Sequence, residues 1–96
     1  MMLVVTCDVD ATNASGQKRL RKAAKICKRY GMRVQNSVFE VLLDAAQLVV
    51  LKHELEKIID TEQDSVRFYR LGNSYERRIE TMGKRPRVEA GGALIF

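Results

Sequence analysis

Strand-like and helix-like periodicities alternate along this chain in an order that few folds accommodate. Residues 2–9 and 65–71 alternate as two-faced strands do, whereas residues 20–30 and 48–59 place apolar side chains at helical spacing. Residues 33–43 are rich in Val, Phe and Leu, but Gln35, Asn36 and Ser37 interrupt them and predict a tight reversal between two short antiparallel strands. The order is β-α-β-β-α-β. It predicts a ferredoxin-like α+β fold, with both helices on one face of a four-stranded sheet.

The helix boundaries carry their own signals. Asn13 or Ser15 is expected to cap the first helix, which Gly31 ends. Asp44 is expected to cap the second helix, and Gln47 three residues later completes a capping box. The second helix is predicted to end near residue 60, before the strand at residues 65–71.

The length of 96 residues predicts one domain over residues 1–96, with a core at 1–72 and a tail at 73–96. The tail ends in Leu94, Ile95 and Phe96, which is unusual for a disordered segment. We therefore expect an additional C-terminal strand that docks on this sheet or on the sheet of a partner.

Two helices cannot cover both faces of a sheet, so the other face needs a cover. The alternation of the first strand places Met2, Val4, Thr6 and Asp8 on that open face. Met2 and Val4 are too apolar for a solvated sheet face. The interpretation we favour is a homodimer packed through the open sheet faces; a different protein, or the tail itself, is the alternative cover.

The positive charge is concentrated in segments. The chain carries a formal net charge of +5, and residues 11–33 contain eight basic side chains and no acidic one. This separation of signs favours a nucleic-acid-facing surface over the alternative of a merely solubilising one. The candidate nucleic-acid-binding residues are Lys18, Arg19, Arg21, Lys22, Lys25 and Arg33.

Several site classes find no support in the sequence. Cys7, Cys27 and the single histidine, His53, lack zinc-ligand or redox spacing, so both cysteines are interpreted as small core residues. The chain has no phosphate-binding glycine loop. No secretory signal or membrane-spanning run is recognised, which predicts a cytoplasmic protein without membrane contact.

Asp8 is the candidate catalytic and metal-binding residue. An isologous dimer would bring each Asp8 toward its symmetry mate, and two carboxylates suit Mg²⁺ or Mn²⁺ bound to a phosphate. Such an ion could support phosphodiester cleavage. Asp10 is a candidate second ligand, although an aspartate pair after a strand is more often a loop cap. Phe39 and Tyr69 could stack on bases, but a core or interface position is the commoner role.

Three segments together resemble a known family. They are the strand ending at Asp8, the basic helix from Lys18 to Gly31, and residues 33–40, which read Arg-Val-Gln-Asn-Ser-Val-Phe-Glu. They are similar to the CRISPR-associated endonuclease two family, the small partner of the CRISPR spacer-integration complex. The resemblance extends to Tyr69 and covers most of the core.

The resemblance implies a ferredoxin-like homodimer with a Mg²⁺ site shared by the two copies of Asp8. It also implies a central position between dimers of the CRISPR integrase, with double-stranded DNA bound across basic surfaces and the C-terminal strand docking the partner. The family usually has Tyr before this aspartate, and Cys7 stands there in this chain. The metal ligand itself is unaffected by that difference.

The sequence leaves three alternative functions. The first is a CRISPR adaptation protein that binds DNA and is a metal-dependent endonuclease. The second is a non-catalytic DNA-binding scaffold of the same complex, since one carboxylate per chain makes a sparse nuclease site. The third is an RNA-cleaving toxin or a ligand-binding regulatory module on the same fold. Phosphate contacts carry no base code, so single-stranded RNA stays open as a substrate beside DNA.

Overall fold

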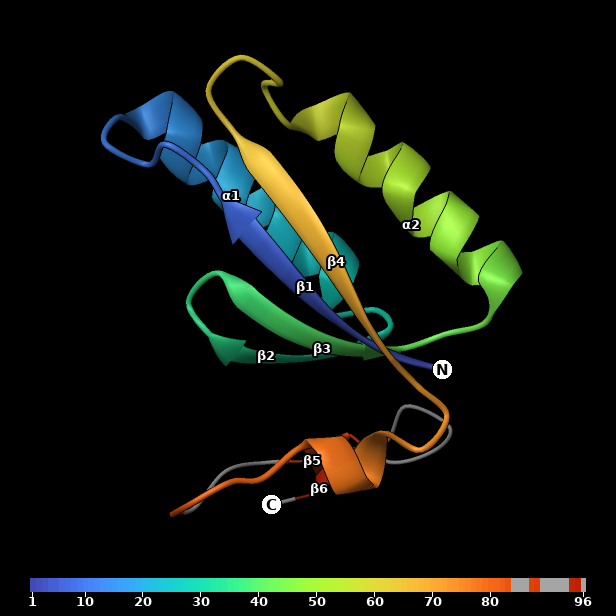
Figure 1. Ribbon diagram of the computed structural model, residues 1–96. Helices are drawn as coiled ribbons and strands as arrows, with labels where there is room; N and C mark the ends of the chain where they lie inside the picture. The colour runs from blue at the N-terminus through green and yellow to red at the C-terminus, as the bar shows by residue number, and fades with distance from the viewer. Residues whose placement is uncertain (84–86, 89–93, 96) are drawn as a thin grey trace.

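The computed structural model describes residues 1–83 and the backbone of residues 87–88 and 94–95. Figure 1 shows the chain from its N-terminus to its C-terminus. The elements in chain order are β1 (Met2–Asp8), α1 (Ala14–Cys27), β2 (Gly31–Gln35), β3 (Val38–Leu42), α2 (Ala45–Ile58), β4 (Ser65–Gly72), the short 3-10 helix η1 (Tyr75–Arg78), β5 (Arg87–Val88) and β6 (Leu94–Ile95).

The first four strands form one antiparallel sheet in the order β2-β3-β1-β4. Both helices lie on the same face of this sheet (Figure 1). This arrangement confirms the ferredoxin-like α+β prediction. β1 is a central strand with β3 and β4 on either side, so the residue at its end lies between two neighbouring strand ends.

The expected caps define where the helices begin. The Asn13 side chain accepts a hydrogen bond from the Gly16 backbone N–H at 2.9 Å, which selects Asn13 over Ser15 as the cap of α1. Asp44 and Gln47 form the predicted capping box at the start of α2. α1 ends at Cys27, and turn residues connect it to β2, which begins at Gly31 rather than at residue 33 as predicted.

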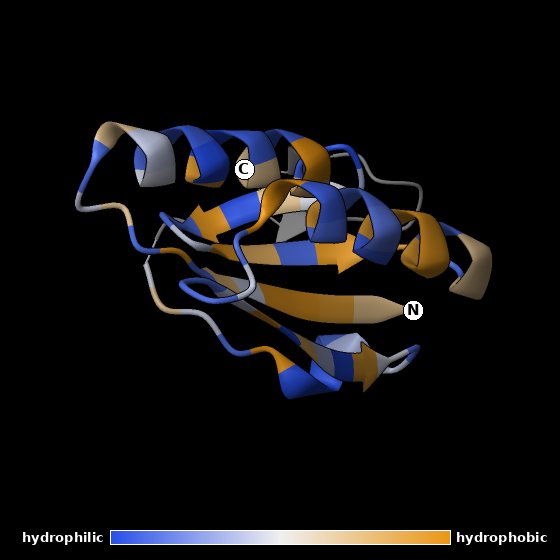
Figure 2. Cartoon of the chain, turned by 90° about the horizontal axis from the view of Figure 1, so that it is seen from above, coloured by the Kyte–Doolittle hydropathy of each residue, from blue (hydrophilic) through white to orange (hydrophobic). Residues whose placement is uncertain are grey.

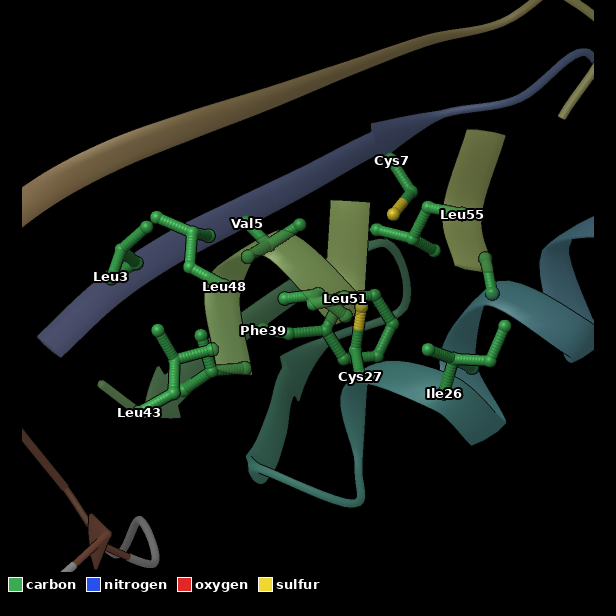
Figure 3. Close-up of a cluster of buried hydrophobic side chains, with 13 residues drawn as sticks. Leu3, Val5, Cys7, Ile26, Cys27, Phe39, Leu43, Leu48, Leu51 and Leu55 are labelled. Atoms are coloured by element: carbon green, nitrogen blue, oxygen red, sulfur yellow. The ribbon is translucent and has the colours of Figure 1, made fainter. Parts of the chain in front are cut away.

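The main core lies between the sheet and the helices. Figure 3 shows β1 side chains meeting Leu48, Leu51 and Leu55 of α2 around Phe39. Cys7 and Cys27 are both buried free thiols in this cluster, which confirms their interpretation as core residues. In Figure 2 the apolar colour follows β1 and recurs along the helices, whose other positions are hydrophilic. The apolar alternation of β1 therefore produces a one-sided core, as the sequence predicted.

A second, smaller cluster occupies the other face of the sheet. Met2 is only 1% exposed and packs with Met32, Leu71, Tyr75 and Ile79. The expectation that Met2 needs a second copy of the chain as its cover is therefore wrong, because residues following β4 already bury it. Val4 is half-buried. The alternative that the chain's own tail covers the open face holds for the Met2 end of the sheet.

The predicted C-terminal strand is present as a backbone element, but it lies outside the four-stranded sheet. β6 pairs antiparallel with β5, which itself lies near β2 and β3. Antiparallel pairing of two nearby segments needs only a short connection, which favours this local partner. The expectations that involve Phe96 fall outside the described residues. No helix in the described part of the chain is long and apolar enough to cross a membrane.

Candidate metal and nucleic-acid site

Asp8 is the last residue of β1 and pairs with Ser65, the first residue of β4. Leu3, Val5 and Cys7 are buried on the helix side of β1. Because side chains alternate along a strand, Asp8 points to the opposite face, where it is exposed. No hydrogen bond to its carboxylate is found among the described residues, so its oxygens are available to a ligand.

Arg67 is the cation beside Asp8. It lies on β4 opposite Thr6 of β1, and therefore on the same sheet face as Asp8. Its Nη1 donates a hydrogen bond of 3.3 Å to the Tyr69 hydroxyl. This hydroxyl and, to a smaller extent, the Asp8 carboxylate raise the pKa of Arg67 above its usual value. The open face thus presents a carboxylate and a guanidinium together at one end.

Asp10 is separated from this pair by the end of the strand. Asp10 would share the face of Asp8 only if the strand continued to it, and β1 stops at Asp8. The Asp10 Oδ1 accepts hydrogen bonds from the Thr12 hydroxyl at 2.7 Å and the Thr12 backbone N–H at 3.2 Å. These bonds lower the pKa of Asp10. The geometry is that of a loop cap, the commoner alternative for an aspartate at this position.

The chemistry of the donor set at Asp8 fits a hard divalent cation, because Mg²⁺ and Mn²⁺ prefer carboxylate oxygens. A single carboxylate is nevertheless a poor site by itself. The described residues contain no group of three His, Cys, Asp or Glu side chains that could hold a metal ion. A site at Asp8 would therefore be incomplete in one chain, and a second copy is one source of the missing ligand.

Four of the predicted nucleic-acid-binding residues are exposed on α1: Lys18, Arg21, Lys22 and Lys25. α1 covers one face of the sheet (Figure 1), whereas the alternation along β1 directs Asp8 to the other face. The structure therefore does not bring these cations together with Asp8 in one chain. A nucleic acid that touches both has to pass around an edge of the sheet, which only a long ligand can do.

The other two predicted cations have partners inside the protein. Arg19 forms an ion pair with Asp64, with Nε 2.8 Å from Oδ2. Arg33 pairs in register with the buried Phe39, which places it on the helix side of the sheet. Its guanidinium lies 5.6 Å from the centroid of the Phe39 ring, and its Nε donates to the Asn36 carbonyl oxygen at 2.7 Å. Neither side chain stands beside Asp8 on the open face.

The two aromatic candidates for base stacking differ in burial. Phe39 is fully buried, which confirms the core interpretation and removes it as a base-stacking residue. Tyr69 is 47% exposed on the open face, opposite Val4. Cys7, in the place of the family's usual tyrosine, points into the core (Figure 3). Its side chain therefore faces away from any ligand of Asp8.

The sequence patterns did not select Arg67 or Asp64 as site residues. Alternation within residues 65–71 could have placed Arg67 and Tyr69 on one face. Their position beside Asp8 depends on the register between β1 and β4, which alternation alone does not give.

Comparison with known proteins identifies the family of this chain. Residues 1–79 match the family model described as CRISPR-associated protein Cas2. The chain belongs to the Cas2 family. The resemblance noted from the sequence is thereby confirmed.

Cas2 relatives match along the whole chain. It is 50% identical over 96 residues to the CRISPR-associated endonuclease Cas2 of Halalkalibacterium halodurans, covering 100% of both chains. It is 50% identical over 95 residues to a CRISPR-associated endoribonuclease Cas2 of Rhodospirillum rubrum, covering 99% of this chain and 100% of the relative. These relatives are named as nucleases, in agreement with the predicted class of enzyme.

A crystal structure of Streptococcus pyogenes Cas2 at pH 6.5 superposes with a TM-score of 0.80 at 53% identity. It covers 86% of this chain and 100% of the Streptococcus chain. This structural match agrees with the family assignment and with the ferredoxin-like fold of this chain.

Proposed function

We propose that this Cas2 family member is a homodimeric, Mg²⁺- or Mn²⁺-dependent endonuclease that acts in CRISPR adaptation. The strongest support is the placement of Asp8, an exposed carboxylate at the end of a central strand, beside Arg67 and on the sheet face opposite the helices. Family membership and the nuclease names of the relatives agree with this chemistry.

Each residue has a distinct part in the proposed reaction. Asp8 and the partner copy's equivalent aspartate hold the divalent ion, which when bound supplies Lewis-acid activation of the scissile phosphate. Arg67 lies on the same face and neutralises negative charge on the phosphodiester backbone. The α1 cations hold the nucleic acid strand through phosphate contacts outside the reacting centre.

The dimer contact is proposed on the open face at the Asp8 end of the sheet. The tail buries Met2 at the other end, whereas Val4 stays half-buried and Tyr69 exposed. A two-fold axis near this end would bring the two Asp8 residues together and cover the neighbouring Val4 and Tyr69 side chains.

We further propose that the dimer binds double-stranded DNA together with the CRISPR integrase during spacer acquisition. Membership of a CRISPR-associated family supports this placement, as do the basic residues on α1, which track phosphates without reading bases. Single-stranded RNA remains the alternative substrate, because two of the relatives differ in being named endonuclease and endoribonuclease.

The test compares cleavage of duplex DNA and single-stranded RNA by the purified dimer, with Mg²⁺ or with a chelator. Asp8→Asn, checked as a dimer by light scattering, is expected to lose metal-dependent cleavage. Glu62→Ala removes an exposed carboxylate from the turn before β4 and serves as the matched control that keeps activity. Equal cleavage by Asp8→Asn and the wild type would contradict the shared-metal proposal.

A non-catalytic scaffold is the second candidate, and one observation favours it. The described part of the chain has no cluster of three metal-ligating side chains, so it holds no multidentate metal site within one protomer. The scaffold predicts DNA binding that is independent of Asp8 and no cleavage of either substrate. A toxin would cleave RNA without binding the integrase, and a regulatory module would bind a small molecule without affinity for nucleic acid.

A further inference from the structure

The Asp64 carboxylate connects three chain segments through hydrogen bonds at the end of the sheet where Asp8 lies. Its residue is 8% exposed, directly before β4. Oδ1 accepts the Asp10 backbone N–H at 3.2 Å, and Oδ2 accepts the Asp60 backbone N–H at 2.9 Å. Arg19 of α1 donates to both oxygens, from Nε at 2.8 Å and from Nη2 at 3.2 Å. One carboxylate thus joins the loop after β1, the second turn of α1 and the turn before β4.

This ion pair is shielded from water. The side chain of Asp64 is 0% exposed and that of Arg19 is 16% exposed. A third hydrogen bond, from Arg19 Nη1 to the Ser15 hydroxyl at 3.0 Å, fixes the plane of the guanidinium. The bidentate fork requires both groups in one orientation, which a lysine in place of Arg19 would not reproduce.

A second contact holds the same loop. Gly16, in the first turn of α1, lies so close to the Asp10 backbone carbonyl that a Cβ at residue 16 would overlap it. Asp10 is therefore held on two sides, through its N–H by the Asp64 carboxylate and through its C=O by the close packing of Gly16. Asp10 is two residues beyond Asp8, and Asp64 directly precedes Ser65, the strand partner of Asp8.

We infer that Arg19 and Asp64 are positioning residues that fix the Asp8 carboxylate for metal binding. This inference rests on the proposed function of Asp8. The pair holds the backbone at Asp10, two residues after Asp8, and Asp64 directly precedes Ser65, the strand partner of Asp8, while the Asp8 side chain itself makes no hydrogen bond among the described residues. Its orientation is set by the backbone, so loosening that backbone should weaken metal binding without removing a ligand.

The experiment measures the affinity of the intact dimer for Mn²⁺ by calorimetry and by the Mn²⁺ electron paramagnetic resonance spectrum, without any nucleic acid. Asp64→Asn and Arg19→Gln are expected to weaken binding at least about tenfold, the lower end of the effect of outer-shell partners. Arg19→Lys, which keeps the charge but loses the fork, is expected to fall between these variants and the wild type. Glu54→Gln breaks the exposed Arg29–Glu54 pair between the helices and should leave the affinity unchanged.

Two further measurements separate positioning from folding. In an Asp8→Ala background, Asp64→Asn should have no further effect on Mn²⁺ binding, because it acts through Asp8. Amide exchange at Asp10 should accelerate in Arg19→Gln, at a temperature where the protein stays folded. Wild-type affinity in Asp64→Asn, or unchanged Asp10 exchange, would overturn the inference alone. Absence of Asp8-dependent Mn²⁺ binding in the wild type would overturn the proposed function and this inference with it.

Discussion

Gly31, at the start of edge strand β2, lies directly against the backbone carbonyl of Glu40 in β3. A Cβ at residue 31 would overlap this carbonyl and crowd the Cα of Val41, its partner in the strand register. Gly31 is buried, and only three residues separate it from the last residue of α1. The chain can therefore leave the helix and join the edge of the sheet within one short turn.

Gly31→Ala is expected to reduce the free energy of unfolding by about 1–3 kcal/mol, since backbone atoms of β3 would have to move. Urea unfolding measures the change. Gly72→Asn is the matched control, because residue 72 has φ of +75° with open space around it, and Asn tolerates that conformation. A Gly31→Ala variant as stable as the wild type would contradict the close approach to Glu40.

The fold was largely predictable because its signals are local. The two-residue period of β1, the helical stripes and the caps at Asn13 and Asp44 each depend on a few neighbouring residues. The interruption at residues 35–37 likewise marked the β2–β3 turn. What the patterns could not provide was the cover of Met2, because Tyr75 and Ile79 lie more than 70 residues away in the chain.

The candidate site was predictable only at Asp8. Alternation along β1 placed Asp8 on the open face, and the structure agrees. Basic residues on one segment were grouped as a single surface, but Arg19 pairs with Asp64 and Arg33 lies over Phe39. Net charge does not reveal which cations have internal partners, because these partners come from distant segments.

Asp44→Ala is expected to lower the free energy of unfolding by about 1 kcal/mol, because the variant loses the oxygen that accepts the Gln47 backbone N–H at 2.7 Å. Asn is an equally good cap, so Asp44→Asn should stay close to the wild type. Chemical denaturation of both variants measures this difference. Equal losses in the two variants would show that the charge of Asp44, and not its capping oxygen, stabilises α2.

The Arg19–Asp64 pair predicts a pH-dependent contribution to stability. The Arg19 guanidinium lowers the pKa of Asp64 below its ordinary value of 3.8, so the ionised carboxylate stabilises the folded state above that pH. This contribution is lost as the pH falls below 3.8 and through the lowered folded value. Asp64→Asn should reduce the melting temperature by about 5–10 °C at neutral pH. This difference from the wild type should become smaller in acid.

Thermal unfolding of Asp64→Asn and the wild type between pH 2 and pH 7 measures this difference in melting temperature. If the melting-temperature difference between Asp64→Asn and the wild type stays the same down to the lowest pH, the lost stability comes from packing and not from the ionised pair.

Nucleic acid binding should depend on α1 and not on total charge. Lys22 and Lys25 are exposed on α1, whereas Lys52 and Lys57 are exposed on α2 in a segment with an acidic balance. Each double change to Ala removes two positive charges. For the α1 pair, duplex DNA affinity should fall, and the slope of log K against log salt should flatten by about 0.9 for each phosphate that the protein no longer neutralises. For the α2 pair, the slope should stay at the wild-type value. Fluorescence anisotropy over a salt series measures these slopes. Equal slopes in the two double variants would show that the α1 cations serve solubility and that DNA binds to another surface.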